Sequence, residues 1–409
     1  TLYAPFVGEN GKIWYRGSLD GKSDTLLVTN SIDELPKPID FGECKNTRRT
    51  YLHPSSLDPF AVLIDCGDSW EINYLDNNNP GSKWHKSLSK QFPNSLISFG
   101  WTEDGKKAFV SVRSSTNPGD FYLLNTEKKS INYIGSSNQS LDLELLSESK
   151  LFMFTARDGK KLQGIYSHPK DSQGNVPLIV IPHGGPKGPA DVPFYDPWVQ
   201  VLNSFGYATL KVNFRSSGGY GDLLEDAGDK AWGTSVIDDI TDGVNWVLNN
   251  KQVNADKICV IGASFGGYAT MMSLIREPDL YQCGVPMMGV YDLSIMFTRD
   301  RADASRGKAR YMEDYRKNVI GHGDDAHMLV HSPLNNADKV KDPVFFIHGA
   351  EDKRVPIIHM ERMQSALSSL NKPYETLVFD DEGHGWRQEE NKVEFYQKLK
   401  DFLSKHLDT

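Results

Sequence analysis

The stretch Gly262-Ala263-Ser264-Phe265-Gly266-Gly267 decides the fold of this chain. It directly follows the apolar run Lys257–Ile261 and precedes a segment whose pattern is compatible with a helix. Small residues on both sides of a serine let the chain turn sharply from a strand into a helix. The turn lifts the hydroxyl above the sheet edge, near the positive end of the helix. The pattern therefore predicts a nucleophilic Ser264, and the simpler alternative is a tight structural turn with an ordinary serine.

The chain on both sides of this turn alternates between strand and helix patterns. Val176–Pro182 is a continuous apolar run, as expected for a strand buried on both faces of a parallel sheet. The other predicted strands are Tyr207–Phe214, Lys257–Ile261, Val344–Ile347 and Glu375–Phe379, and the predicted helices are Ser235–Asn249, the stretch from Gly266 onward, Ile357–Leu370 and Asn391–His406. This alternation predicts a parallel α/β sheet. Together with the turn at Ser264 it predicts an α/β-hydrolase catalytic domain over residues 151–409.

Residues 1–150 have a different sequence pattern. Their apolar runs are short, rich in β-forming residues and broken by Gly, Asn, Asp and Ser, and no sustained period of 3.6 residues is present. These runs are Lys12–Arg16, Thr25–Thr29, Ala61–Asp65, Ala108–Arg113 and Phe121–Asn125. They recur in loose units of roughly 40–50 residues, which is the spacing of propeller blades. We therefore expect an all-β segment that resembles part of a β-propeller, with a small β-sandwich as the alternative.

Bulk composition excludes several classes of protein. The chain has 409 residues, enough for two or three domains, and its 39% apolar and 24% charged residues are typical of globular proteins. The net charge is −9 and no basic cluster stands out, so we expect no nucleic-acid partner. No apolar run reaches the roughly 18 residues of a membrane span, so we expect no membrane insertion. The chain begins at Thr1 rather than Met, and we expect that an upstream segment has been removed.

The cysteines carry little information. Their spacing, at Cys44, Cys66, Cys259 and Cys283, matches no metal or redox motif, and we expect neither a metal nor another cofactor. Cys259 lies in an apolar strand-like run, where a small buried thiol is the ordinary explanation. One disulfide stays open as an alternative. The compartment is undetermined, with a slight preference for a soluble cytoplasmic protein.

A serine hydroxyl needs a base to activate it, and the base needs a carboxylate to orient it. In α/β-hydrolases the chain order is serine, acid, histidine. Downstream of Ser264, the strand Val344–Ile347 runs into a loop with adjacent Glu351 and Asp352, and Glu375–Phe379 runs into a loop that contains His384 between two glycines. The order and the strand ends select His384 as the base, whereas the residues alone leave the acid open between Glu351 and Asp352.

Hydrolysis also requires preorganised N–H donors for the tetrahedral oxyanion. One predicted donor is the backbone amide of Phe265, which follows the nucleophile. The second should come from the loop His183-Gly184-Gly185-Pro186, which directly follows the strand Val176–Pro182. The alternative for this loop is a simple Gly-Gly-Pro turn.

At this point the chain resembles the prolyl oligopeptidase family of serine peptidases, most closely its acylaminoacyl-peptidase-like branch. The similarity covers nearly all of residues 175–405, in order and with the spacing of the family. The matching stretches are HGGP at His183–Pro186, VNFRSSGGYG at Val212–Gly221, WG and DDITDGV within Trp232–Val244, GASFGGYAT at Gly262–Thr270, SPLNNADKVKDPVFFIHGAEDKRVP at Ser332–Pro356, and DEGHGW at Asp381–Trp386.

The resemblance implies roles for particular residues. It implies a catalytic triad of Ser264, Asp352 and His384, and it selects Asp352 over Glu351 as the acid. It also implies an oxyanion site at the backbone of Gly185 and Phe265. Arg354 would contact a substrate carbonyl, with a surface ion pair as the alternative. The implied S1 pocket is lined by Phe265, Met287, Val290 and Val355. Large aromatics found in proline-specific relatives are missing at Val290 and Leu293, which favours a bulky apolar P1 residue over proline.

These observations predict a serine peptidase that hydrolyses short peptides or acylated N-terminal residues through an acyl-enzyme. A carboxylesterase that uses the same triad is the first alternative, and a protein-interaction module with an inert hydrolase domain is the second. Family members commonly carry about seven propeller blades, whereas residues 1–150 have room for about three. We therefore expect either the C-terminal portion of a longer protein or an incomplete propeller. Endo- or exopeptidase action and self-association stay open.

Overall fold

The computed structural model describes residues 2, 5–9, 11–296 and 313–408. Its backbone contacts divide the chain into two compact units. The first, β-rich unit contains residues 1–153, 192–204 and 218–224, and the second, α/β unit contains residues 154–191, 205–217 and 225–409. The predicted domain boundary at residue 150 stays a prediction.

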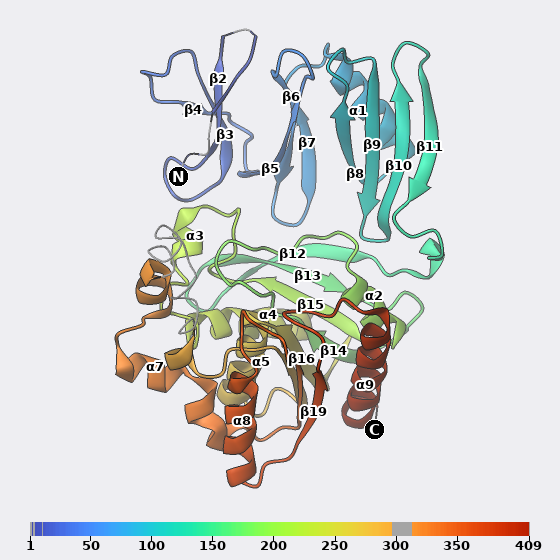
Figure 1. Cartoon of the computed structure of the whole chain (residues 1–409). Coiled ribbons are helices and arrows are strands. Elements are labelled where there is room, and N and C mark those ends of the chain that lie inside the picture. The colour runs from blue at the N-terminus through green and yellow to red at the C-terminus, as the bar shows by residue number, and fades with distance from the viewer. Residues whose placement is uncertain (1, 3–4, 10, 297–312, 409) are drawn as a thin grey trace. The chain divides into compact units, whose positions relative to one another are not determined.

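Three antiparallel sheets make up most of the β-rich unit (Figure 1). Each sheet pairs strands that follow one another along the chain, so each resembles one propeller blade. The sheets are β1 (Phe6–Val7), β2 (Ile13–Gly17), β3 (Thr25–Thr29) and β4 (Lys37–Pro38); β5 (Asn46–Leu52), β6 (Pro59–Asp65) and β7 (Trp70–Tyr74); and β8 (Leu96–Trp101), β9 (Lys107–Ser114), β10 (Asn117–Asn125) and β11 (Ser130–Ser136). This architecture confirms the predicted propeller-like segment.

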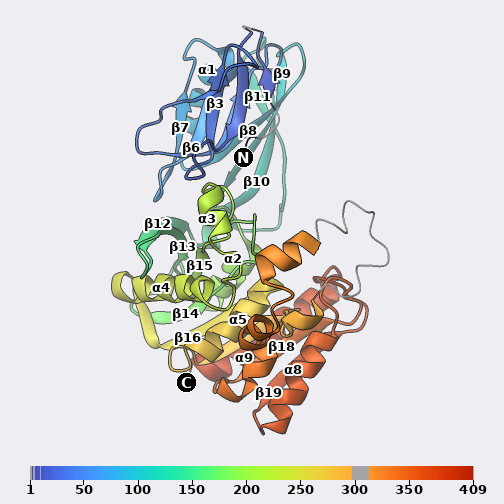
Figure 2. The same cartoon turned by 90° about the vertical axis from the view of Figure 1, so that its left-hand side faces the viewer.

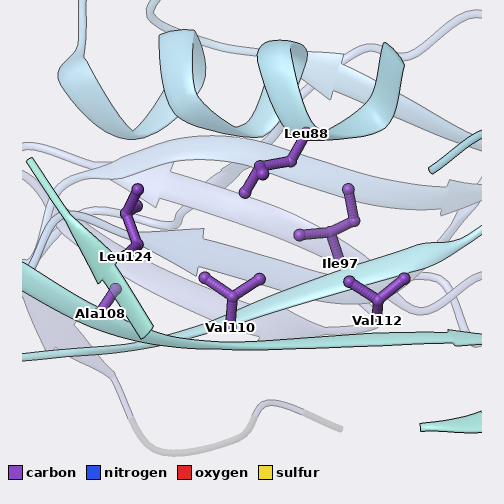
Figure 3. Packing of buried hydrophobic residues seen from close by; sticks show 6 residues of the cluster. All are labelled: Leu88, Ile97, Ala108, Val110, Val112 and Leu124. Atoms are coloured by element: carbon purple, nitrogen blue, oxygen red, sulfur yellow. The ribbon is translucent and has the colours of Figure 1, made fainter. Parts of the chain in front are cut away.

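A helix inserted between the second and third sheets was not predicted from the sequence. This helix, α1, spans Pro80–Gln91, and Asn79 caps it by accepting a hydrogen bond from the N–H of Gly81. Its buried positions include a glycine, a serine and a histidine, which is why no apolar period is visible in the sequence. Leu88 is the apolar exception, and it packs onto Ile97, Ala108, Val110, Val112 and Leu124 of the third sheet (Figure 3).

A mixed sheet is the centre of the α/β fold. Its strand order is β12-β13-β15-β14-β16-β17-β18-β19. β13 is antiparallel to β15, and the strands from β15 to β19 run parallel to one another. The strands are β12 (Ser149–Thr155), β13 (Lys161–Ser167), β14 (Val176–Val180), β15 (Ala208–Asn213), β16 (Val253–Ala263), β17 (Cys283–Met287), β18 (Val344–Gly349) and β19 (Tyr374–Phe379). This arrangement confirms the predicted α/β-hydrolase fold.

Helices follow the strands of this sheet, as the alternation in the sequence predicted. Four of them match the predicted helices: α4 (Ser235–Asn250), α5 (Phe265–Arg276), α8 (Ile358–Ser369) and α9 (Glu389–Leu407). Three more were not predicted from the sequence: α2 (Pro197–Ser204), α3 (Asp222–Asp226) and α7 (Asp325–His331). Shorter turns of 3₁₀ or π type span Leu143–Leu145, Leu293–Ile295, Arg316–Ile320 and Pro333–Lys339. Figure 2 shows α4 and α5 beside the strands of the sheet. Within the described part of the chain, no helix has the length and apolar character that crossing a bilayer requires.

The register of the parallel strands brings distant residues to one edge of the sheet. Ala263 of β16 pairs with Met287 of β17, and Met287 pairs in turn with Ile347 of β18. Ile347 pairs with Leu377 of β19. The paired residues Ala263, Met287, Ile347 and Leu377 thus lie in one row across the sheet. The loops that follow them begin at the same carboxyl edge, where α/β proteins place their ligands.

The four cysteines form two disulfides, Cys44–Cys66 and Cys259–Cys283. The expectation of a free buried thiol at Cys259 is therefore wrong. Cys259 and Cys283 are paired neighbours on the parallel strands β16 and β17, with Cα atoms 4.8 Å apart. That spacing lies within the range for a disulfide, and it depends on a strand register that the sequence spacing does not reveal.

A buried ion pair anchors the segment that follows β15. Arg215 is 5% exposed and Asp239 of α4 is fully buried. The guanidinium binds the carboxylate in a bidentate manner at 2.7 and 2.5 Å, and the Arg215 backbone N–H donates to the same carboxylate at 2.9 Å. Because Asp239 neutralises a charge that is shielded from water, removing it leaves Arg215 with the partly exposed Asp158 at 3.0 Å as its acidic partner.

We expect Asp239→Ala to lower the free energy of unfolding of the α/β unit by about 3 kcal/mol, because a buried charge loses its main partner. Urea unfolding followed by circular dichroism measures the change. Lys341→Ala is the matched control, since it removes the exposed pair between Lys341 and Asp279 and should change stability little. Equal effects of the two substitutions would contradict this assignment.

Candidate active site

Ser264 lies at the sharp turn that the sequence predicted. β16 ends at Ala263 and α5 begins at Phe265, so Ser264 is the only residue between strand and helix. Its backbone has φ of 60° and ψ of −120°, a conformation that L residues rarely adopt. The N–H of Ser264 donates to the carbonyl of Met287 at 3.0 Å, and the Ser264 carbonyl accepts from Gly267 at 3.0 Å. These bonds hold the serine at the carboxyl edge of the sheet.

The loop after β14 packs against this turn. A Cβ atom built on Gly266 would collide with the carbonyl oxygen of Pro182, so a side chain at position 266 would push the loop away. A Cβ on Gly184 would lie 3.5 Å from the Cβ of Ser264. The fold thus brings the predicted oxyanion loop next to Ser264. Phe265 is the first residue of α5, so its N–H has no acceptor within the helix and is free to serve a ligand.

Asp352 and His384 meet at the same edge of the sheet. Asp352 lies in the turn after β18, and His384 lies in the loop after β19. The His384 Nδ1 atom is 2.6 Å from Oδ2 of Asp352, a distance typical of a strong charge-assisted hydrogen bond. An ionised carboxylate only accepts hydrogen bonds, so Nδ1 carries a proton, and in the neutral ring the opposite nitrogen, Nε2, is then the acceptor. The imidazole is therefore in the tautomer that a general base requires.

The acid is buried and held from its other side. Asp352 is 5% exposed, and its Oδ1 accepts hydrogen bonds from the backbone N–H groups of Arg354 at 2.8 Å and Val355 at 2.9 Å. Burial would raise the pKa of Asp352, but the hydrogen bonds from His384, Val355 and Arg354 outweigh it and lower the pKa below its usual value. Asp352 therefore stays ionised at neutral pH, whereas the neighbouring Glu351 is exposed.

A second histidine near the acid has a structural role. His348, at the end of β18, is fully buried, and its Nε2 donates to the carbonyl of Val355 at 2.8 Å. The same nitrogen is 3.8 Å from the carboxylate of Asp352. Burial lowers the pKa of His348, so the ring stays neutral at neutral pH. Its bond to Val355 fixes the turn that holds the acid.

His183 fixes the orientation of the neighbouring Gly184–Gly185 peptide. Its Nδ1 lies 2.8 Å from the carbonyl oxygen of Gly184, and since a carbonyl only accepts, Nδ1 is the donor. Nε2 then accepts from the hydroxyl of Ser217 at 2.8 Å. In a planar trans peptide the C=O and N–H point in opposite directions. The bond to Gly184 therefore turns the N–H of Gly185 away from His183.

The predicted substrate contacts fall into two groups. Phe265, Met287, Val290 and Val355 are all buried, and the Met287 carbonyl is bonded to Ser264. The side chain of Arg354 is exposed, and its backbone N–H donates a hydrogen bond to Asp352. The hydrogen bonds thus link Met287, Val355 and Arg354 to residues of the candidate triad. Their contact with a substrate stays a prediction.

Two features of the site were missed by reasoning from the sequence. The first is the double hydrogen bonding of His183, although its place in the HGGP motif was a usable signal. The second is Glu382, a buried carboxylate in the loop of His384. Glu382 lies in the DEGHGW motif, but its role was not visible there, because its partners are backbone N–H groups and the Asn391 amide at the start of α9.

The strand order, the sharp turn at Ser264 and the acid–histidine pair at the sheet edge define an α/β-hydrolase-fold protein. Comparisons with known proteins define its family. The model of the prolyl oligopeptidase family matches residues 194–409, which is more than half of the chain. The chain belongs to the prolyl oligopeptidase family.

Individual relatives agree with this membership. The chain is 29% identical over 317 residues to dipeptidyl aminopeptidase BIII of Pseudoxanthomonas mexicana, covering 75% of this chain and 45% of that protein. It is 31% identical over 328 residues to dipeptidyl peptidase family member 6 of Caenorhabditis elegans, covering 73% and 43%. Acylaminoacyl peptidase of Pyrococcus horikoshii has a similar fold, with a TM-score of 0.70 at 21% identity, covering 99% of this chain and 63% of that one. The chain thus spans less than half the length of these two curated relatives.

Proposed function

We propose that this chain carries the catalytic machinery of a serine peptidase that acts on short peptides or acylated N-terminal residues. The observation that carries the proposal is the 2.6 Å hydrogen bond between Asp352 and His384, at the sheet edge where Ser264 occupies the strand–helix turn. Family membership supports the reaction class. The names of the two curated relatives add peptides with a free amino terminus to the substrates that need testing.

In this proposal, Ser264 Oγ attacks the carbonyl carbon of the scissile amide and His384 Nε2 accepts the hydroxyl proton. His384 then gives that proton to the leaving amine as the C–N bond breaks, which leaves an acyl-enzyme on Ser264. Water repeats the sequence with the acyl group and releases the acid. Asp352 holds the tautomer of His384 and stabilises the imidazolium that forms during each half of the reaction.

The backbone N–H groups of Gly185 and Phe265 are the proposed oxyanion donors. Donors of this kind act where negative charge develops on the carbonyl oxygen. The start of α5 supports the role of Phe265, because the helix dipole favours an anion at this end. The bond from His183 to Gly184 supports the role of Gly185, because it orients the shared peptide.

The proposed S1 pocket accepts an apolar side chain. Phe265, Met287, Val290 and Val355 are apolar and buried, and such a lining disfavours a charged P1 residue because the charge would lose its water. The exposed guanidinium of Arg354 is proposed to contact a substrate carbonyl. Its neighbour Val355 shares the turn that holds Asp352, so the contact would lie beside the triad.

We expect the wild-type chain to release p-nitroaniline from peptidyl substrates, and Ser264→Ala to lose this activity by roughly a factor of 10⁶, the size of effect reported for triad nucleophiles. Absorbance assays with free-amino, N-acylated and X-Pro peptides, alongside a matched p-nitrophenyl ester, measure it. Amide cleavage that survives in Ser264→Ala would contradict the proposed nucleophile. Cleavage of the ester alone would indicate a carboxylesterase on the same residues.

We expect His183→Ala to lower kcat roughly 10²–10³-fold, because the Gly185 N–H loses its fixed direction toward the oxyanion. KM should change much less, since the bond is worth most in the transition state. His168→Ala is the matched control, because it removes another partly buried histidine that is bonded to Tyr166. A His183→Ala variant with unchanged kcat would contradict the proposed role of Gly185.

A further inference from the structure

Glu382 is a buried carboxylate in the loop that carries His384. It is 2% exposed, whereas its neighbour Asp381 is exposed. Burying a charged carboxylate is costly unless hydrogen bonds compensate for the lost water. The burial of Glu382 in a loop therefore calls for an explanation in terms of its partners.

The side chain of Glu382 ties this loop to the start of α9. One oxygen, Oε1, accepts from the backbone N–H groups of Arg387 at 2.8 Å and Gln388 at 2.9 Å, and from the amide of Asn391 at 3.1 Å. Burial raises the pKa of Glu382, but these hydrogen bonds outweigh it and lower the pKa below its usual value. The charge also lies at the favourable end of the α9 dipole.

The backbone of Glu382 ties the same loop to the turn of the acid. Its carbonyl accepts from the N–H of Glu351 at 3.0 Å, directly before Asp352. A Cβ on Gly349 would collide with the carbonyl oxygens of Glu382 and Gly383, so the two loops are in direct backbone contact. Glu382 thus links the histidine loop to the start of α9 through its side chain and to the turn of Asp352 through its backbone.

We propose that Glu382 is a positioning residue that sets the hydrogen bond between His384 and Asp352 by anchoring the histidine loop to α9 and to the acid turn. The importance of this bond for turnover rests on the proposed function. The simpler alternative is that Glu382 only stabilises the start of α9. The two readings differ in what its removal does to the bond between His384 and Asp352.

Three variants separate these readings. Glu382→Gln keeps an amide oxygen whose two lone pairs can accept the backbone hydrogen bonds from Arg387 and Gln388. Glu382→Ala removes this oxygen, and Glu382→Asp keeps the charge on a side chain that is too short. Asp381→Ala is the matched control, since Asp381 also binds Gln388 and Asn391 but is exposed. The low-field proton NMR resonance of His384 Nδ1–H, assigned by its loss in His384→Gln, reports the bond to Asp352 independently of turnover.

We expect Glu382→Ala and Glu382→Asp to lose or shift this resonance while circular dichroism shows a folded chain, and Glu382→Gln and Asp381→Ala to retain it. The kcat of Glu382→Ala should fall roughly 10–100-fold with little change in KM, since a displacement of about 1 Å in a catalytic group costs about 100-fold. If Glu382→Ala does not fold, the comparison of Glu382→Gln with Glu382→Asp decides.

A lower melting temperature of Glu382→Ala with an unchanged resonance would overturn the proposal in favour of a helix cap. Equal loss of the resonance in Glu382→Gln and Glu382→Ala would also overturn it, because the hydrogen bonds would then not be the cause. The NMR resonance could depend on Glu382 while hydrolysis does not depend on Ser264. That result would support the positioning role of Glu382 and reject the proposed function.

Discussion

The close approach of the backbone at the end of β16 is the constraint on which the site depends. Ser264 has φ of 60°, and Gly266 leaves room for the carbonyl of Pro182. A Cβ built on Gly184 would lie 3.5 Å from the Cβ of Ser264, so this loop lies beside the serine. The strained turn places Ser264 at the sheet edge, and the packed loop brings the proposed oxyanion donor Gly185 into its neighbourhood. A side chain at Gly266 would separate two parts of the site that must act together.

A second close approach sets the acid–base pair. Gly349 leaves room for the carbonyls of Glu382 and Gly383, so the loops after β18 and β19 touch through their backbones. Asp352 and His384 are thereby held 2.6 Å apart although they belong to different loops. The site is therefore assembled by backbone contacts between loops, with buried carboxylates such as Asp352 and Glu382 fixed by N–H groups.

Much of this arrangement could be predicted from the sequence, because β14 and β18 and the end of β16 that leads to Ser264 are apolar runs. The predicted Thr25–Thr29 is β3, and the predicted Ser235–Asn249 and Val344–Ile347 match α4 and β18 within a few residues. The α1 helix was missed because its buried face holds small and polar residues rather than an apolar stripe. The Cys259–Cys283 disulfide and the contacts of Glu382 were missed because they depend on strand register and on loop approach, which no local pattern encodes.

We propose that the fold, and not the serine alone, makes Ser264 a nucleophile. The most direct measurement is labelling with a fluorophosphonate probe, followed by mass spectrometry of the digested chain to locate the adduct. We expect one adduct, on Ser264, that is lost when the chain is unfolded before labelling and strongly reduced in His384→Gln. An adduct on another serine, or labelling of Ser264 that is unchanged by unfolding or by the loss of His384, would contradict it.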